Sequence, residues 1–173
     1  MWYFLFPPMP LTKSEFRKAM GHFATGVTVV TVLREPGQIH GMTANSFASV
    51  SLEPLLVLVC VDQRAQTLPL IQEQKQFGIN VLAHNQQPLA EYFSHPEQSE
   101  QDARRLGVAF RFSERGTPLL EGCIVQLDCV LVSSHVAGDH TVFLAEVDSA
   151  ELHSGSALLF YAGRYRRVPP EPL

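Results

Sequence analysis

Segments rich in valine, threonine and other β-forming residues, separated by turn-forming residues, cover most of the chain after residue 26. We expect strands at residues 27–33, 39–45, 47–52, 55–61, 77–83, 123–136, 140–152 and 158–167. The segment 55–61 is apolar on both faces, which predicts a central strand. Many strands joined by short turns favour a closed or nearly closed antiparallel barrel.

A few short helices accompany these strands. Thr12 and Glu15 have the spacing of a capping box, and an apolar face follows at helical spacing. That face consists of Phe16, Ala19, Met20 and Phe23. A second helix is expected at about residues 67–76 and a third from about Pro88. The polar residues 95–105 predict an exposed helix or loop.

The length of 173 residues suits one domain with a substantial core. We expect that domain at residues 12–168, with an apolar extension at 1–11 and a tail at 169–173. The extension is too short to span a bilayer and lacks the basic start of a secretory signal. The three cysteines, Cys60, Cys123 and Cys129, predict reduced thiols in the cytoplasm.

Composition and motifs exclude several function classes. A net charge of −4 without a basic field disfavours nucleic acid as a partner. The seven histidines lack the spacing of a metal site, and no glycine-rich phosphate loop is present. The basic residues Arg164, Arg166 and Arg167 are typical of a solvated strand end.

Three stretches hold small polar residues suited to a ligand. Residues 41–46 and 49–51 carry hydroxyl and amide groups where one strand ends and the next begins, which suits a planar heterocycle. Residues 62–67 lead into a helix start, where free amide donors suit a phosphate and Arg64 adds charge. Residues 138–140 place His140 at a turn. Each stretch also fits a plain role, as a polar turn, a capped helix or an incidental histidine.

Together these segments resemble the flavin reductase-like family, which includes the reductase components of two-component flavin-dependent monooxygenases. The resemblance runs from about residue 16 to 168. It rests on Phe16-Arg17, Met20-Gly21, residues 23–31, 41–47 and 49–52, Pro54, residues 59–61, Thr67, Phe77, residues 80–82 and 138–140, and Tyr161-x-Gly-x-Tyr165. It implies a mainly β fold, an antiparallel Greek-key FMN-binding split β-barrel with a few short peripheral helices, usually paired as a homodimer.

The resemblance also implies an activity and a site. NADH or NADPH would reduce FMN or FAD, and the reduced flavin would pass to a partner monooxygenase or react with oxygen. The implied flavin-binding residues are Gly41, Met42, Thr43, Ala44, Asn45, Ser46, Ser49, Val50, Ser51, Cys60, Val61, Asp62, Thr67, Phe77, Asn80 and Tyr165. The implied catalytic residues are His140, which would contact the nicotinamide, and Thr43, near the polar edge of the ring.

One position departs from the family, and two other functions stay open. Ala65 stands where a small hydroxyl residue is common, and a lost hydrogen bond of about 1 kcal/mol would tune flavin affinity. A flavin carrier, sensor or structural barrel without turnover is one alternative. An oxidase that retains its flavin is the other. The sequence does not separate NADH from NADPH, or FMN from FAD and riboflavin.

Overall fold

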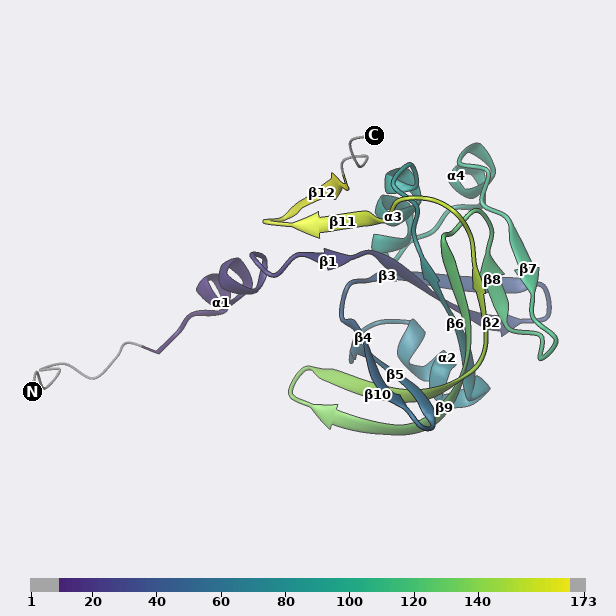
Figure 1. Ribbon diagram of the computed structural model, residues 1–173, viewed down its shortest axis with the longest axis horizontal. Helices are drawn as coiled ribbons and strands as arrows, with labels where there is room; N and C mark the ends of the chain where they lie inside the picture. The colour runs from purple at the N-terminus through teal and green to yellow at the C-terminus, as the bar shows by residue number, and fades with distance from the viewer. Residues whose placement is uncertain (1–9, 169–173) are drawn as a thin grey trace, which may run out of the picture.

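A seven-stranded antiparallel sheet forms the body of the molecule in the computed structural model, which describes residues 10–168. The strand order is β3-β2-β6-β9-β10-β5-β4, and the sheet curls into a barrel (Figure 1). Its strands are β2 (Thr28–Glu35), β3 (Gln38–Ala44), β4 (Phe47–Leu52), β5 (Leu55–Asp62), β6 (Gln76–Val81), β9 (Val125–Ala137) and β10 (His140–Leu152). Within residues 10–168 no strand pairing joins β3 to β4, so the barrel is split, and the expected mainly β class is confirmed.

Short elements surround this barrel. The strands β1 (Thr25–Gly26), β11 (Leu158–Tyr161) and β12 (Arg164–Arg167) form a second sheet, and β7 (Phe110–Phe112) pairs with β8 (Pro118–Leu120). The helices are α1 (Lys13–Met20), α2 (Thr67–Gln74), α3 (Gln87–Ser94) and α4 (Glu100–Arg105). With eight residues at most, no helix in the described part of the chain can cross a bilayer.

Two expectations about strands were wrong in detail. Residues 158–167 form a hairpin rather than one strand, because Ala162 and Gly163 turn the chain at φ values of 50° and 74°. The apolar strand β5 is second from the sheet edge, not central, and its buried residues alternate. Of its other apolar residues, Leu55 is exposed, and Leu56 and Leu58 are half-buried.

The core consists of two clusters that α2 and α3 complete. Inside the barrel, valines of β2 and β5 pack around Phe77 and Phe143, and α2 adds Ile71. The helix α2 packs against β2, β3, β5 and β6, strands far apart in the sequence. Outside the barrel, α3 packs on β2 and β3 through Ala90 and Phe93. Both helices therefore meet the edge strand β3.

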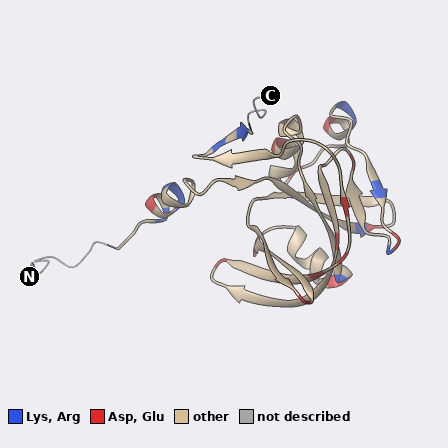
Figure 2. Ribbon diagram, in the orientation of Figure 1, with Lys and Arg blue, Asp and Glu red and all other residues tan. Residues whose placement is uncertain are grey.

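The N-terminal helix α1 stands apart from the barrel (Figure 1). Its capping box is confirmed: Glu15 N donates to Thr12 Oγ1 (3.2 Å), and Thr12 N donates to Glu15 Oε2 (2.9 Å). No residue of α1 is buried, and Phe16 and Met20 are 56% and 51% exposed. Lys and Arg gather on α1, α4, β7 and β12, away from most of the barrel strands (Figure 2). The expected amphipathic helix exists, but its apolar face is uncovered.

Candidate active site

The corner between β3 and β4 contains the stretch 41–46 that the sequence singles out. Residues 41–44 end β3, which has one neighbouring strand in the described part of the chain, so one of its backbone edges has no strand partner within residues 10–168. Asn45 and Ser46 form the loop to β4, and Ser46 Oγ donates to Cys60 O (2.7 Å) on β5. The corner thus combines an open strand edge with polar side chains, an arrangement suited to a planar polar ligand.

Two residues of this corner are engaged by α3. A Cβ atom on Gly41 would lie 2.5 Å from the ring of Phe93, so glycine is needed here for packing as well as for access. The Thr43 hydroxyl donates to Ala90 O (2.7 Å). That hydroxyl can then only accept a further hydrogen bond, which leaves backbone N–H groups and the Asn45 side-chain amide as donors at this corner.

One cavity, which we call the Thr67 cavity, lies between this corner and the start of α2. It has a volume of about 320 Å³ and is lined by His40, Gly41, Met42, Thr43, Arg64, Ala65, Gln66, Thr67, Phe93, Ser94, His95, Pro96 and Gln98. Thr67 is completely buried, and its Oγ1 lies 2.9 Å from His40 Nε2. Gln66 is the cap residue of α2, and Thr67 is its first helical residue.

His40 is a site residue that the sequence analysis missed. Burial, with a contribution from the nearby positive charge of Arg34, lowers the pKa of His40 to about 4. The imidazole is therefore neutral at neutral pH and contributes no charge to the Thr67 cavity. The sequence signal that could have identified His40 is its position on β3, immediately before the predicted stretch 41–46.

The end of β5 meets the start of β10. His140 is paired with Asp62 across the two strands. Arg64 donates to Asp62 through its backbone N (2.8 Å), Nε (3.0 Å) and Nη2 (2.7 Å), and these bonds hold the pKa of Asp62 well below its usual range. Arg64 remains 88% exposed, so its guanidinium stays accessible to a ligand beside the Thr67 cavity.

A second cavity, the His140 cavity, lies on the other side of the corner. It has a volume of about 500 Å³ and is lined by Lys13, Phe16, Arg17, Met20, Gly21, Phe23, Asn45, Asp139, His140 and Phe160. The His140 side chain is 43% exposed, and its Nδ1 lies 2.8 Å from Asp139 Oδ1. This bond lowers the pKa of Asp139 and orients the imidazole.

A small third cavity, the Tyr165 cavity, joins the other two. Its volume is about 120 Å³, and its lining consists of Val27, Thr43, Asn45, Phe160 and Tyr165. It shares Thr43 with the Thr67 cavity, and Asn45 and Phe160 with the His140 cavity. Three cavities therefore form a row along residues 40–45, with Thr67 at one end and His140 at the other.

Several predicted site residues lie outside this row. Ser49, Val50 and Ser51 are on β4 and line none of the three cavities. Phe77 lies in the barrel core, and Asn80 lies on the other face of β6, toward β8. Both are completely buried and line none of the three cavities, so the cavities do not support their predicted place in a cofactor site. The amide of Asn80 has its partners within the fold: Nδ2 donates to Val29 O (2.9 Å) and Thr31 Oγ1 (3.0 Å), and Oδ1 accepts from Leu120 N (2.8 Å).

The remaining predicted residues support the corner from behind. Val61 is completely buried in the barrel core, whereas Cys60 is half-buried and donates its backbone N–H to Ser46 O (3.1 Å). Burial raises the pKa of the Cys60 thiol. Ala44 is nearly buried. These residues fix the loop that carries Asn45.

Comparison with known proteins places the chain among flavin reductases. Residues 20–169 match the model of the flavin reductase like domain. An NADH-dependent flavin reductase of Rhodococcus sp is 42% identical over 160 residues, which are 91% of this chain and 88% of that protein. An NADH-dependent FAD reductase of Streptomyces globisporus is 37% identical over 164 residues, 94% of this chain and 89% of that protein.

Solved structures agree in fold. The flavin reductase PheA2 in its native state superposes with a TM-score of 0.82 at 38% identity, covering 91% of this chain and 99% of that one. The Streptomyces globisporus NADH:FAD oxidoreductase SgcE6, solved with NAD and FAD fragments, gives a TM-score of 0.83 at 37% identity, covering 92% and 94%. The chain therefore belongs to the flavin reductase like domain family.

Proposed function

We propose that this chain is an NADH-dependent flavin reductase that reduces FMN or FAD and supplies reduced flavin to a partner monooxygenase. The observation that carries this proposal is the row of three cavities between Thr67 and His140. An elongated ligand with a phosphate at one end and a flat polar ring at the other matches such a row. The relatives named as NADH-dependent flavin reductases support the same ligands.

The Thr67 cavity fits the phosphate end of a flavin. It lies at the start of α2, where the helix dipole favours negative charge. Pro69 has no N–H, and Leu68 N donates to Ala65 O (3.2 Å), so these two residues of the first turn offer no amide donor to an anion. Arg64 lines it with a largely exposed guanidinium. Ala65 provides no hydroxyl, so the anion depends on backbone N–H groups and Arg64, while Thr67 is held by His40.

The strand edge at residues 43–45 fits the ring. Backbone N–H groups on an unpaired strand edge can donate to ring oxygens and nitrogens, and they stabilise negative charge that develops during reduction. The Thr43 hydroxyl is committed to Ala90 as a donor, so we assign Thr43 a positioning role through its backbone. Tyr165 and Phe160 pack edge to face, with ring centroids 5.4 Å apart, and close this side of the row.

His140 fits the nicotinamide side. A bound flavin supplies the group that accepts the hydride. The chain has to hold the nicotinamide against it and exclude water from the contact. His140, oriented by Asp139, faces the His140 cavity and can hydrogen-bond the carboxamide of the incoming ring. We assign no general base, because hydride transfer between two rings requires no proton from a side chain.

The assembly and the location are further parts of the proposal. Relatives named as reductase subunits or components of monooxygenases support a monooxygenase partner. We propose a homodimer, because α1 and the outer sheet face, with Val50, Val132 and Val136, expose apolar surface that a second copy can cover. Three free cysteines support a cytoplasmic location, and residues 12–168 are the proposed domain.

The function is tested by measuring the oxidation of NADH and of NADPH through their absorbance, with FMN, FAD or riboflavin added in turn. Turnover that requires added flavin supports a reductase with an exchangeable flavin. Tight flavin binding without any oxidation would favour a carrier, and activity on another reduced substrate would favour an oxidase. The variant His140→Ala should raise KM for the nicotinamide about tenfold, because it removes one good hydrogen bond to that ring. It should leave the flavin Kd within about twofold.

A further inference from the structure

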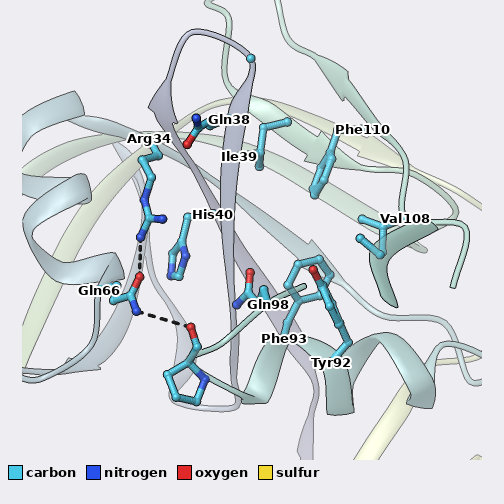
Figure 3. A pocket seen from close by; sticks show the side chains of 13 residues that line it. Arg34, Gln38, Ile39, His40, Gln66, Tyr92, Phe93, Gln98, Val108 and Phe110 are labelled. Carbon is cyan, nitrogen blue, oxygen red and sulfur yellow. Dashed lines mark hydrogen bonds between the residues drawn. The ribbon is translucent and has the colours of Figure 1, made fainter. Parts of the chain in front are cut away.

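A fourth cavity, the Arg34 cavity, lies beyond the phosphate end of the row (Figure 3). Its volume is about 340 Å³. It shares His40, Gln66, Phe93, Pro96 and Gln98 with the Thr67 cavity, so the two are continuous. A ligand whose phosphate lies near Arg64 can therefore extend into this space, away from His140.

One wall of the Arg34 cavity is aromatic and apolar. Tyr92 and Phe93 pack edge to face with ring centroids 4.8 Å apart, and Phe93 and Phe110 do so at 6.4 Å. Val108 and Ile39 add aliphatic surface on the same side (Figure 3). Flat heteroaromatic rings gain both burial and stacking energy against such a wall.

The facing wall is polar and positively charged. Arg34 Nη2 donates to Gln66 Oε1, and Gln66 Nε2 donates to Pro96 O (3.4 Å), which makes a chain of donors along this side (Figure 3). Within residues 10–168 the structure gives Arg34 no carboxylate partner, unlike Arg64. The buried His40 contributes no charge at neutral pH. A neutral ring next to phosphate oxygens and ribose hydroxyls matches these two walls.

Resting on the proposed function, we infer that the Arg34 cavity binds the adenosine half of FAD, so that FAD is preferred to FMN and riboflavin. Adenine stacks on the wall of Tyr92 and Phe110, and Arg34 hydrogen-bonds the second phosphate or the ribose. FMN ends at its phosphate and leaves this cavity empty. The selectivity between flavins then depends on residues remote from the ring-binding corner.

Isothermal titration calorimetry of FAD, FMN and riboflavin, at one fixed salt concentration, tests this inference. Wild type should bind FAD about tenfold or more tightly than FMN, because FAD gains a charge-assisted hydrogen bond and a stacked ring. Arg34→Ala should weaken FAD binding about tenfold and change FMN binding by less than about twofold. Arg34 is an exposed residue at the end of β2, so its replacement leaves the core intact.

A second variant tests the space itself. Gln38 is exposed and lines the Arg34 cavity but not the Thr67 cavity, so Gln38→Trp fills only the former. It should lower FAD affinity and spare FMN. Arg115→Ala is the matched control, because Arg115 is ion-paired with Asp148 and lines neither cavity.

The outcomes separate this inference from the proposed function. Equal affinities for FAD and FMN in wild type, with NADH oxidation intact, overturn the inference alone. Equal losses for both flavins in Arg34→Ala do so as well, since Arg34 would then bind the shared phosphate. Absence of both flavin binding and NADH oxidation overturns the proposed function too.

Discussion

The helices α1 and α2 are both eight residues long, but they are specified in opposite ways. The helix α1 has a complete capping box and a regular apolar face, yet none of its residues is buried. The helix α2 has no side-chain cap and a proline in its first turn, yet Thr67 and Ile71 are completely buried. Local signals made α1 easy to predict, whereas tertiary contacts hold α2.

The functional consequence follows from this difference. Because α2 packs against four strands of the barrel, it can hold Thr67 and the neighbouring residues at fixed positions beside β3. A precise ligand site needs such support. Within residues 10–168, α1 has no buried residue. Its apolar residues Phe16 and Met20 line the His140 cavity and remain open to contact with a second copy.

The largest expected effect is on packing. Ile71→Ala should lower the free energy of unfolding by about 2–5 kcal/mol, because it leaves a cavity in the barrel core. Met20→Ala, on the exposed face of α1, should cost less than about 0.5 kcal/mol within one chain. Urea unfolding at several protein concentrations measures both, since a second copy covering α1 would make the Met20 effect concentration-dependent. If Ile71→Ala and Met20→Ala lowered the free energy of unfolding equally at every protein concentration, the contrast between the buried α2 and the exposed α1 would be contradicted.

A smaller loss of stability is expected when the hydrogen bond between Thr67 of α2 and His40 of β3 is removed. Thr67→Val should cost about 1–3 kcal/mol, because it leaves His40 Nε2 buried without a partner. Thr67→Ser keeps the hydroxyl and is the control. Urea unfolding and FMN titration of both variants test this, and a Val variant as stable as Ser would show that the bond contributes nothing.

The pH dependence of stability should also report on this bond. His40 has a pKa of about 4 in the folded protein, below its ordinary value of 6.5, so the folded state binds fewer protons than the unfolded state between these values. Stability is therefore retained above pH 6.5 and falls as the pH decreases toward 4. Carboxylates add losses in the same direction, so the relevant quantity is wild type minus His40→Gln. A difference that does not vary between pH 6.5 and 4 would refute this role.

The smallest effect is expected at the cap of α1. Thr12→Ala should destabilise this helix by about 1 kcal/mol and leave FMN affinity unchanged, because the capping box is remote from α2. Hydrogen exchange of the α1 amides measures the change, with the exposed neighbour Ser14→Ala as the control. Weakened FMN binding in Thr12→Ala would mean that α1 takes part in the flavin site.

Strand prediction succeeded where the pattern is local. The bounds of β4 and β10 match the expected segments 47–52 and 140–152. The hairpin of β11 and β12 was missed because its turn begins at Ala162, a residue type with no turn preference. The strands β7 and β8 are only three residues long, too short for a periodic signal.

Prediction of the site was uneven for a related reason. The stretch 41–46 and His140 carry their own small polar or turn signals, and the structure brings residues 41–43, Asn45 and His140 into one row of cavities. Asn80 was a candidate only through the family resemblance, and in the structure its side-chain amide hydrogen-bonds Val29 of β2 and Leu120 of β8. Arg34 and Phe93 were missed, because nothing near them in the sequence indicates that they face the same cavity.

The sequence by itself determined the seven strands of the large sheet, the capped helix α1 and the polar character of the corner at β3, since each depends on residues within a few positions of one another. Only the tertiary structure decided which of these surfaces are covered. It paired β5 with β10, placed His140 beside Asp62, and set α2 and α3 against β3. Burial depends on contacts between segments that are distant along the chain. The tertiary structure therefore decides which polar residues face a cavity and which support the core.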